Sequence, residues 1–190
     1  MHKFAPLFLF IGLANGLAAE SKFAPTDWPN WRGLTSDGQA PLVEGLPTEW
    51  SEKNNVVWKT SIPGKGHSTP TVVGGRIYLA TADENEMFQA VLCVDKADGR
   101  VVWQTKVHEG QFAIGLNTNA SHAGTAVVHD GERLFVNFVI GNQAFASAID
   151  LDGKILWQKP IGKYKVHQGY GSSPMVYRDI VVVKADPKIG

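Results

Sequence analysis

The heptapeptide VVWQTKV at residues 101–107 is the most informative part of the sequence, because related heptapeptides occur twice more. They are VVWKTSI at 56–62 and ILWQKPI at 155–161. In each copy the residue two before Trp and the residue four after it are β-branched and apolar, while the residue directly after it is Lys or Gln. This alternation is typical of a half-buried β-strand.

The spacing of these heptapeptides indicates a repeat. Their tryptophans lie 45 residues apart, from Trp58 to Trp103, and then 54 apart, to Trp157. Both spacings are close to the one-blade period of four-stranded propeller repeats. Helical periodicity is absent from the sequence after residue 20. The chain is therefore predicted to be all-β.

A hairpin pattern recurs between the tryptophans, and in two copies it continues into a strand that ends in Asp, at 89–95 and 143–150. The pattern predicts two whole four-stranded antiparallel blades, at about 67–107 and 122–161, and half of a third. The hairpins are expected at 69–82 around Gly74-Gly75, 125–139 around Asp130-Gly131, and 173–185 near Arg178-Asp179.

The tryptophan strand at 54–62 stands alone, without preceding strands to pair with. About 2.5 blades are thus expected at 54–190, out of the seven or eight of a β-propeller. Because so short an array leaves sheet surface exposed, we expect the chain to continue beyond Gly190 and to supply partners for the lone strand.

The first residues predict export. Residues 1–19 have a basic start, an apolar run and small residues before Glu20, as a signal peptide does. A membrane anchor is the alternative, but the run is short for a bilayer, and no cysteine stands near the cleavage site to carry a lipid. We therefore expect a periplasmic or secreted protein without a membrane span after signal removal.

A Pro- and Trp-rich lead-in at 20–53 follows. Its tryptophans, Trp28, Trp31 and Trp50, are expected to pack on the propeller, because large aromatic side chains are rarely left in water. The charge is balanced, with 18 basic and 18 acidic residues and no block of one sign, which argues against a nucleic-acid partner. Cys93 is the only cysteine of these 190 residues, so no disulfide can form within them.

Residues 93–103 (CVDKADGRVVW) and 148–157 (AIDLDGKILW) resemble the tryptophan-docking motif of quinoprotein dehydrogenases, Ala-x-Asp-x-x-x-Gly-Lys-x-x-Trp. The first copy has Cys for Ala and Arg for Lys, and the second is one residue short in the turn. Residues 28–33 (WPNWRG) also resemble the opening of secreted bacterial quinone-binding-like propellers. The resemblance to this pyrroloquinoline quinone (PQQ)-repeat family implies a propeller in which the tryptophan of one blade stacks on its neighbour.

His67 and His122 are the candidate ligand- or cofactor-binding residues. Each precedes the first strand of a blade, and we expect the two to occupy equivalent positions of the repeat, where the third copy has Gly171. The resemblance implies that such strand openings face the central channel, with Asn117, Asn119 and His167 nearby. The alternative is that both histidines are hydrogen-bonded repeat positions, and two histidines alone do not make a metal site.

The remaining residues favour binding over catalysis. Asp98, Asp130 and Asp152 are expected to cap turns, and neither a phosphate-binding Gly-rich loop nor a hydrolase elbow is present. The adjacent cysteines of quinoprotein alcohol dehydrogenases are absent. We therefore expect a non-catalytic scaffold propeller of the bacterial cell envelope, with a protein or small-molecule ligand. The alternative is a PQQ-dependent dehydrogenase with calcium, whose active site lies mostly in other blades, so the cofactor stays open.

Overall fold

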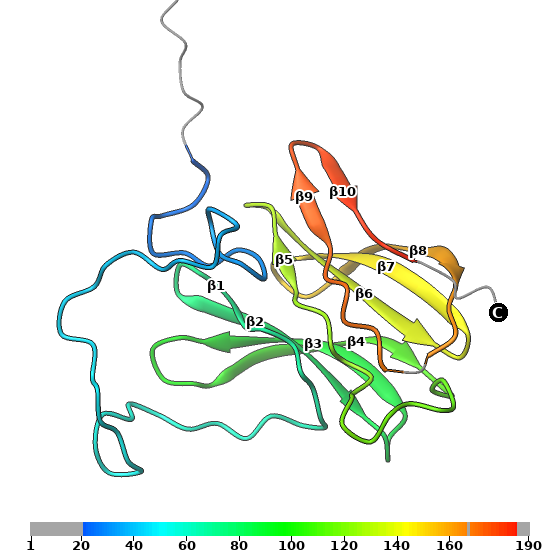
Figure 1. Cartoon of the computed structure of the whole chain (residues 1–190), viewed down its shortest axis with the longest axis horizontal. Helices are drawn as coiled ribbons and strands as arrows, with labels where there is room; N and C mark the ends of the chain where they lie inside the picture. Colours follow the sequence, from blue (N-terminus) through cyan, green and yellow to red (C-terminus); the bar gives the residue numbers. More distant parts are fainter. Residues whose placement is uncertain (1–20, 167, 186–190) are drawn as a thin grey trace, which may run out of the picture.

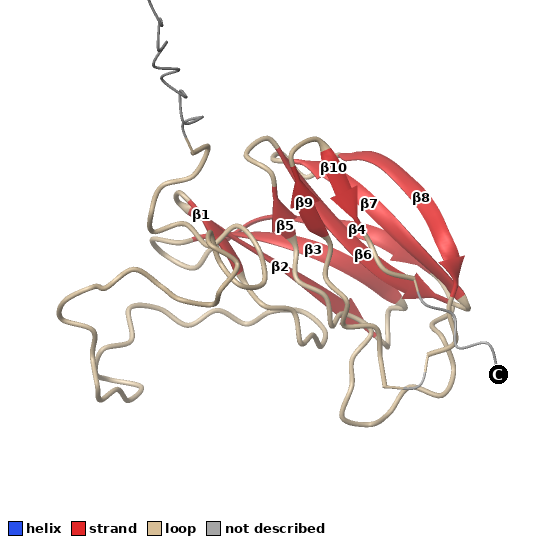
Figure 2. Cartoon of the chain, turned by 45° about the horizontal axis from the view of Figure 1, so that its top comes forward, coloured by secondary structure: helices blue, strands red, loops and turns tan. Residues whose placement is uncertain are grey.

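The computed structural model describes residues 21–166 and 168–185, and every regular element within them is a β-strand (Figures 1 and 2). The predicted signal peptide lies outside the described residues. The strands form two four-stranded antiparallel sheets and one two-stranded hairpin, each with strands in chain order. The predicted blades are thus confirmed as two antiparallel meanders followed by a further hairpin.

The first sheet contains β1 (Thr71–Val73), β2 (Arg76–Asp83), β3 (Phe88–Asp95) and β4 (Val101–Glu109). The second contains β5 (Val128–His129), β6 (Arg133–Ile140), β7 (Gln143–Asp150) and β8 (Ile155–Lys163). The hairpin is β9 (Met175–Tyr177) and β10 (Ile180–Val182). The first strands of the three units contact one another in the order β1, β5, β9.

The hairpin turns follow from their residues. Gly74 has a φ of 57° between β1 and β2, a conformation in which a side chain is strained. The turn after β5 is centred one residue later than predicted, because Asp130 pairs with Arg133 as the first residue of the turn. The carboxylate of Asp130 accepts hydrogen bonds from the backbone N–H groups of Glu132 and Arg133, which fixes that frame.

The prediction of a strand at 54–62 is wrong. Ser51 and Asn54 form an isolated bridge, and the residues after them join no ladder, running instead as the extended connection drawn in cyan in Figure 1. No described strand pairs with residues 55–62, and side-chain hydrogen bonds of Trp58 and Thr60 hold this segment.

The lead-in is packed on the sheets over part of its length. Trp28 exchanges backbone hydrogen bonds with Val72 of β1, at 2.6 and 2.9 Å, and the carbonyl of Pro29 accepts one from His129 of β5. This part of the chain therefore links the two sheets. Trp31 and Trp50 are 56% and 71% exposed, so the expected packing is confirmed for Trp28 alone.

The main core lies between the two sheets. One cluster of buried side chains takes members from both, including Tyr78 and Val91 of the first sheet and Leu134, Phe138 and Ile149 of the second. A single sheet of this kind cannot bury both of its faces, so each is stabilised by stacking on its neighbour.

Candidate binding site

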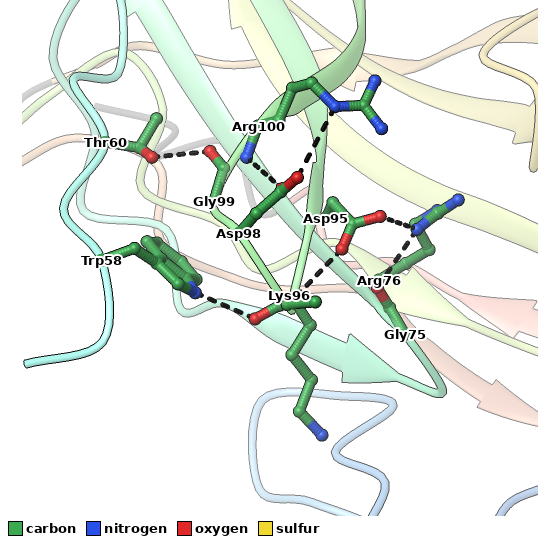
Figure 3. Close-up of polar contacts among 10 residues, drawn as sticks. Trp58, Thr60, Gly75, Arg76, Asp95, Lys96, Asp98, Gly99 and Arg100 are labelled. Atoms are coloured by element: carbon green, nitrogen blue, oxygen red, sulfur yellow. Dashed lines mark hydrogen bonds and ion pairs between the residues drawn. The ribbon is translucent and has the colours of Figure 1, made fainter.

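The segment around Trp58 is attached to the first sheet by side-chain contacts with the turn at residues 96–99, which we call a joint (Figure 3). The indole Nε1 of Trp58 donates a hydrogen bond to the carbonyl of Lys96 at 2.9 Å, and the Thr60 hydroxyl donates one to the carbonyl of Gly99 at 2.6 Å. Gly99 has a φ of 76°, and a Cβ on it would lie 2.4 Å from the Trp58 ring. Only glycine fits this turn.

The same joint recurs between the two sheets. Trp103 of β4 donates from Nε1 to the carbonyl of Leu151 at 2.9 Å, and the Thr105 hydroxyl donates to the carbonyl of Gly153. Gly153 has a φ of 90° and faces the Trp103 ring. In both copies, the tryptophan segment of one repeat is held by the turn of the next.

The aspartates of the first joint organise its turn. Asp95 accepts a hydrogen bond from the backbone N–H of Ala97 at 2.9 Å, and its other oxygen pairs with Arg76 at 2.5 Å (Figure 3). The bond from Ala97 and the nearby Arg76 charge hold the pKa of Asp95 below its usual value. Asp98 accepts from the backbone N–H of Arg100. Both carboxylates are engaged in holding the turn.

The expectation that aspartates cap the turns is confirmed for Asp98 and for Asp130, which binds the backbone of its own turn. It is wrong for Asp152. The backbone N–H groups of Asp152 and Lys154 both donate to the carboxylate of Asp150. Asp150 ends β7 and thus precedes the turn, where its carboxylate can reach the following N–H groups.

The strand registers show that His67 and His122 are not equivalent positions. Thr71 pairs with Tyr78 in the first hairpin, and Val128 pairs with Phe135 at the same separation in the second. Four residues before these strand positions stand His67 and Gly124. Met175 pairs with Val182 in the third hairpin, and four residues before Met175 stands Gly171. His122 corresponds instead to Lys65.

These three equivalent positions, His67, Gly124 and Gly171, line one hollow of about 220 Å³. The hollow therefore lies where the openings of three successive hairpins converge. His67 is exposed, and its backbone N–H donates to the carbonyl of Ala123 at 2.9 Å, which joins the first opening to the second. The other residues that line the hollow are Asn117, Asn119, Ala120, Ser121, Gln168, Gly169 and Tyr170.

His122 lines a second hollow, of about 410 Å³, together with Lys65 and Glu84. Its ring stacks on Phe112 with 4.3 Å between centroids. Burial lowers the pKa of His122, against an opposing effect of the Glu84 charge. Asn117 borders both hollows, whereas the two histidines line different ones.

The expected grouping of polar residues is therefore met in part. Asn117 and Asn119 lie with His67, as predicted, and His167 lies outside the described residues. Ser121 is a further lining residue, and its buried Oγ has no hydrogen-bond partner among the described residues. The burial of Ser121 carries no signal in the sequence. Over the described ranges, no group of three His, Cys, Asp or Glu side chains is placed to hold a metal ion. Nor do these ranges contain a helix of the length and apolar character needed to cross a membrane.

The sequence matches one protein family model, and the structure is similar to a solved structure. A family model described as outer membrane protein assembly factor BamB matches residues 42–185. The crystal structure of BamB from Moraxella catarrhalis is similar with a TM-score of 0.46 and 13% identity, covering 66% of this chain and 36% of that chain. This chain thus spans about a third of the length of that protein. A search of curated proteins finds no match.

Proposed function

Because this chain belongs to the family described as outer membrane protein assembly factor BamB, we propose that it is a non-catalytic binding scaffold of the bacterial cell envelope. The family match confirms the resemblance to PQQ-repeat β-propellers seen in residues 93–103 and 148–157. The family description concerns assembly of outer-membrane proteins, and a protein or small-molecule partner in the envelope fits it.

The observation that carries this proposal is the repeated joint. In both copies the shared contacts are structural. Tryptophan and the threonine two residues after it donate hydrogen bonds to backbone carbonyls, glycine leaves room for the indole ring, and aspartate caps the turn. We take these joints to be the tryptophan-docking contacts of the family. The motif thus supports the stacking of blades and supplies no acid, base or nucleophile to a reaction.

The ligand positions that we assign to the scaffold are His67, in the hollow between the three openings, and secondarily His122 in its neighbour. Loops that are held by a rigid scaffold are where binding residues concentrate. No carboxylate lies with His67 among the described lining residues, and Glu84 is the one carboxylate residue lining the hollow of His122.

The proposal divides the chain into a signal peptide at 1–19, a lead-in at 20–53 and propeller repeats at 54–190. The protein is then periplasmic or secreted. Intact-mass measurement of exported material tests this division, with an expected start near Glu20. A mass that retains residues 1–19 would contradict it.

The competing function is a PQQ-dependent dehydrogenase. The decisive experiment is titration of PQQ into the full-length protein with and without calcium, together with alcohol-dependent reduction of an artificial electron acceptor. We expect neither calcium-dependent binding nor reduction of the acceptor. Either of them would overturn the scaffold and establish the dehydrogenase.

A further inference from the structure

We propose that the hollow between His67, Gly124 and Gly171 binds a small, uncharged, polyhydroxylated ligand of the sugar class. This inference rests on the proposed binding function and deepens it by naming the chemistry of the ligand. Three observations lead to it: the residue types of the lining, an unsatisfied buried hydroxyl, and the size of the hollow.

The polar lining is made mainly of amide side chains. Amides of Asn117, Asn119 and Gln168 border the hollow with the imidazole of His67, and none of its described lining residues is Asp, Glu, Lys or Arg. Amides offer both donors and acceptors, as sugar hydroxyls require. A charged ligand would lose its hydration here without gaining an ion pair, which is costly.

Ser121 supplies an independent sign of a missing partner. Its side chain is 3% exposed, it lines the hollow, and its Oγ has no hydrogen-bond partner among the described residues. Buried hydroxyls nearly always have such a partner. Oγ is itself covered by its neighbours, so a ligand hydroxyl reaches it only when the wall of the hollow shifts, and would then remove the cost of burying it unpaired.

Asn117 is held ready for the same ligand. Its Oδ1 accepts a hydrogen bond from the backbone N–H of Asn119 at 2.9 Å, which fixes the amide plane. No described residue accepts a hydrogen bond from its Nδ2 group, which is therefore available as a donor. Because this turn is already formed, little conformational entropy is lost when a ligand binds.

The walls of the hollow are also fixed. A Cβ on Gly124 would lie 3.1 Å from the carbonyl oxygen of Tyr170, so the two openings approach as closely as their backbones allow. The hydroxyl of Tyr170 accepts a hydrogen bond from Asn137 at 2.9 Å and donates one to the carbonyl of Lys184. These contacts tie the wall to the second sheet.

The volume selects a ligand of one ring. The hollow measures about 220 Å³, which is below the roughly 300–1,000 Å³ of pockets for drug-sized ligands. A single pyranose ring with its hydroxyls is of this scale.

The test compares glucose, N-acetylglucosamine and glucuronate as probes of the full-length protein, by saturation-transfer NMR and calorimetry. Glucuronate has the glucose ring with a carboxylate added, so it isolates the effect of charge. We expect a dissociation constant of about 1 mM for at least one neutral sugar, since few contacts are available. Glucuronate should bind at least about tenfold more weakly.

His67→Ala and Asn119→Ala remove exposed side chains from the hollow, and each should weaken sugar binding by up to about tenfold. Gln111→Ala is the control, because Gln111 is an exposed amide on the same connection that does not line the hollow. Equal unfolding midpoints of the three variants establish that each is folded.

Absence of saturable binding of both neutral sugars would overturn the inference, as would equal or tighter binding of glucuronate. Binding that both hollow variants leave unchanged would overturn it as well. None of these results bears on PQQ and calcium, so failure of the sugar site and failure of the scaffold proposal are separable.

Discussion

The indole ring of Trp103 lies directly against the backbone of Gly153, so that a Cβ on Gly153 would stand 2.9 Å from Cδ2 of the ring. Trp103 lies in the last strand of the first sheet, and Gly153 lies in the turn between β7 and β8 of the second sheet. The contact therefore joins two repeats. Its counterpart is the approach of Trp58 to Gly99. The stability of the stacked sheets should therefore depend on two glycines that carry no side chain.

Gly153→Ala tests this dependence. The added methyl group must displace the ring and also occupies a strained φ of 90°, so the free energy of unfolding should fall by about 2–4 kcal/mol. Gly141→Ala is the matched control, because Gly141 has a φ of 57° with nothing within 4 Å of its Cβ position. It should lose about 1–2 kcal/mol from backbone strain alone. Denaturant unfolding measures both, and equal losses would contradict a role for the ring.

Trp103→Ala should cost about 3–5 kcal/mol, the range for deleting a large core aromatic. Trp103 packs on the core and contacts the Tyr78 ring at 6.1 Å between centroids. Trp103→Phe keeps most of this packing but loses the bond to the carbonyl of Leu151, so its loss should be smaller. Trp31→Ala, at a side chain that is 56% exposed, should stay within about 0.5 kcal/mol. A loss for Trp103→Ala as small as that of Trp31→Ala would show that the joint does not stabilise the fold.

His108 should make the fold sensitive to acid. Its ring contacts those of Phe138 and Phe145, and its buried Nε2 has no hydrogen-bond partner in the described part of the chain. Burial lowers its pKa from 6.5 to about 4. The unfolded chain therefore binds a proton before the folded one does. Stability is highest above pH 6.5 and falls as the pH drops from about 6.5 to about 4, by about 1–2 kcal/mol after allowance for partial exposure.

His108→Phe removes this titration and preserves an aromatic ring in the same place. Urea unfolding of the parent and variant at pH 7 and pH 4.5 should show a smaller acid loss for the variant, by about 1 kcal/mol. His122 and His129 also have lowered pKa values, so part of the acid loss should remain. An identical acid loss in the two proteins would assign the sensitivity to other groups.

Asp27 should anchor the lead-in. Its carboxylate is buried and accepts hydrogen bonds from the backbone N–H groups of Gly74 and Ala24, at 2.8 and 2.9 Å. Asp27→Ala should lower stability by about 1–3 kcal/mol and increase hydrogen exchange at the Gly74 amide. Asp37→Ala removes a similar carboxylate from an exposed loop and should change stability by less than about 0.5 kcal/mol. Unchanged exchange at Gly74 in Asp27→Ala would contradict the anchor.

The regular part of the fold is readable from the sequence because its signals are local. Alternation and turn residues predict strands at 89–95 and 143–150, and the structure has Phe88–Asp95 and Gln143–Asp150. Alternation alone cannot show whether a segment has a neighbour to pair with, which is why it wrongly predicts a strand at 54–62. The tryptophan and threonine of this segment instead form the side-chain contacts with the turn of the first sheet.

The candidate site was less readable, because its geometry depends on register. Matching histidine to histidine aligns His67 with His122, whereas the hydrogen-bonded pairs align His67 with Gly124. The loop before the second hairpin differs in length from the one before the first, and side-chain identity cannot reveal that difference. The burial of Ser121 likewise depends on loops that are distant in sequence.

In both joints the tryptophan donates to a backbone carbonyl, that of Lys96 in one and that of Leu151 in the other. The hydrogen bond therefore does not depend on which side chains stand at those positions. Tryptophan, threonine and glycine together form a contact of the same geometry in both copies. A unit that carries these three residues at the right places can make this contact with any turn of the same backbone shape, provided that the side chains between the sheets still pack. Duplication or excision of a whole unit within the gene is therefore a mechanically simple way to change the size of a protein built on this plan.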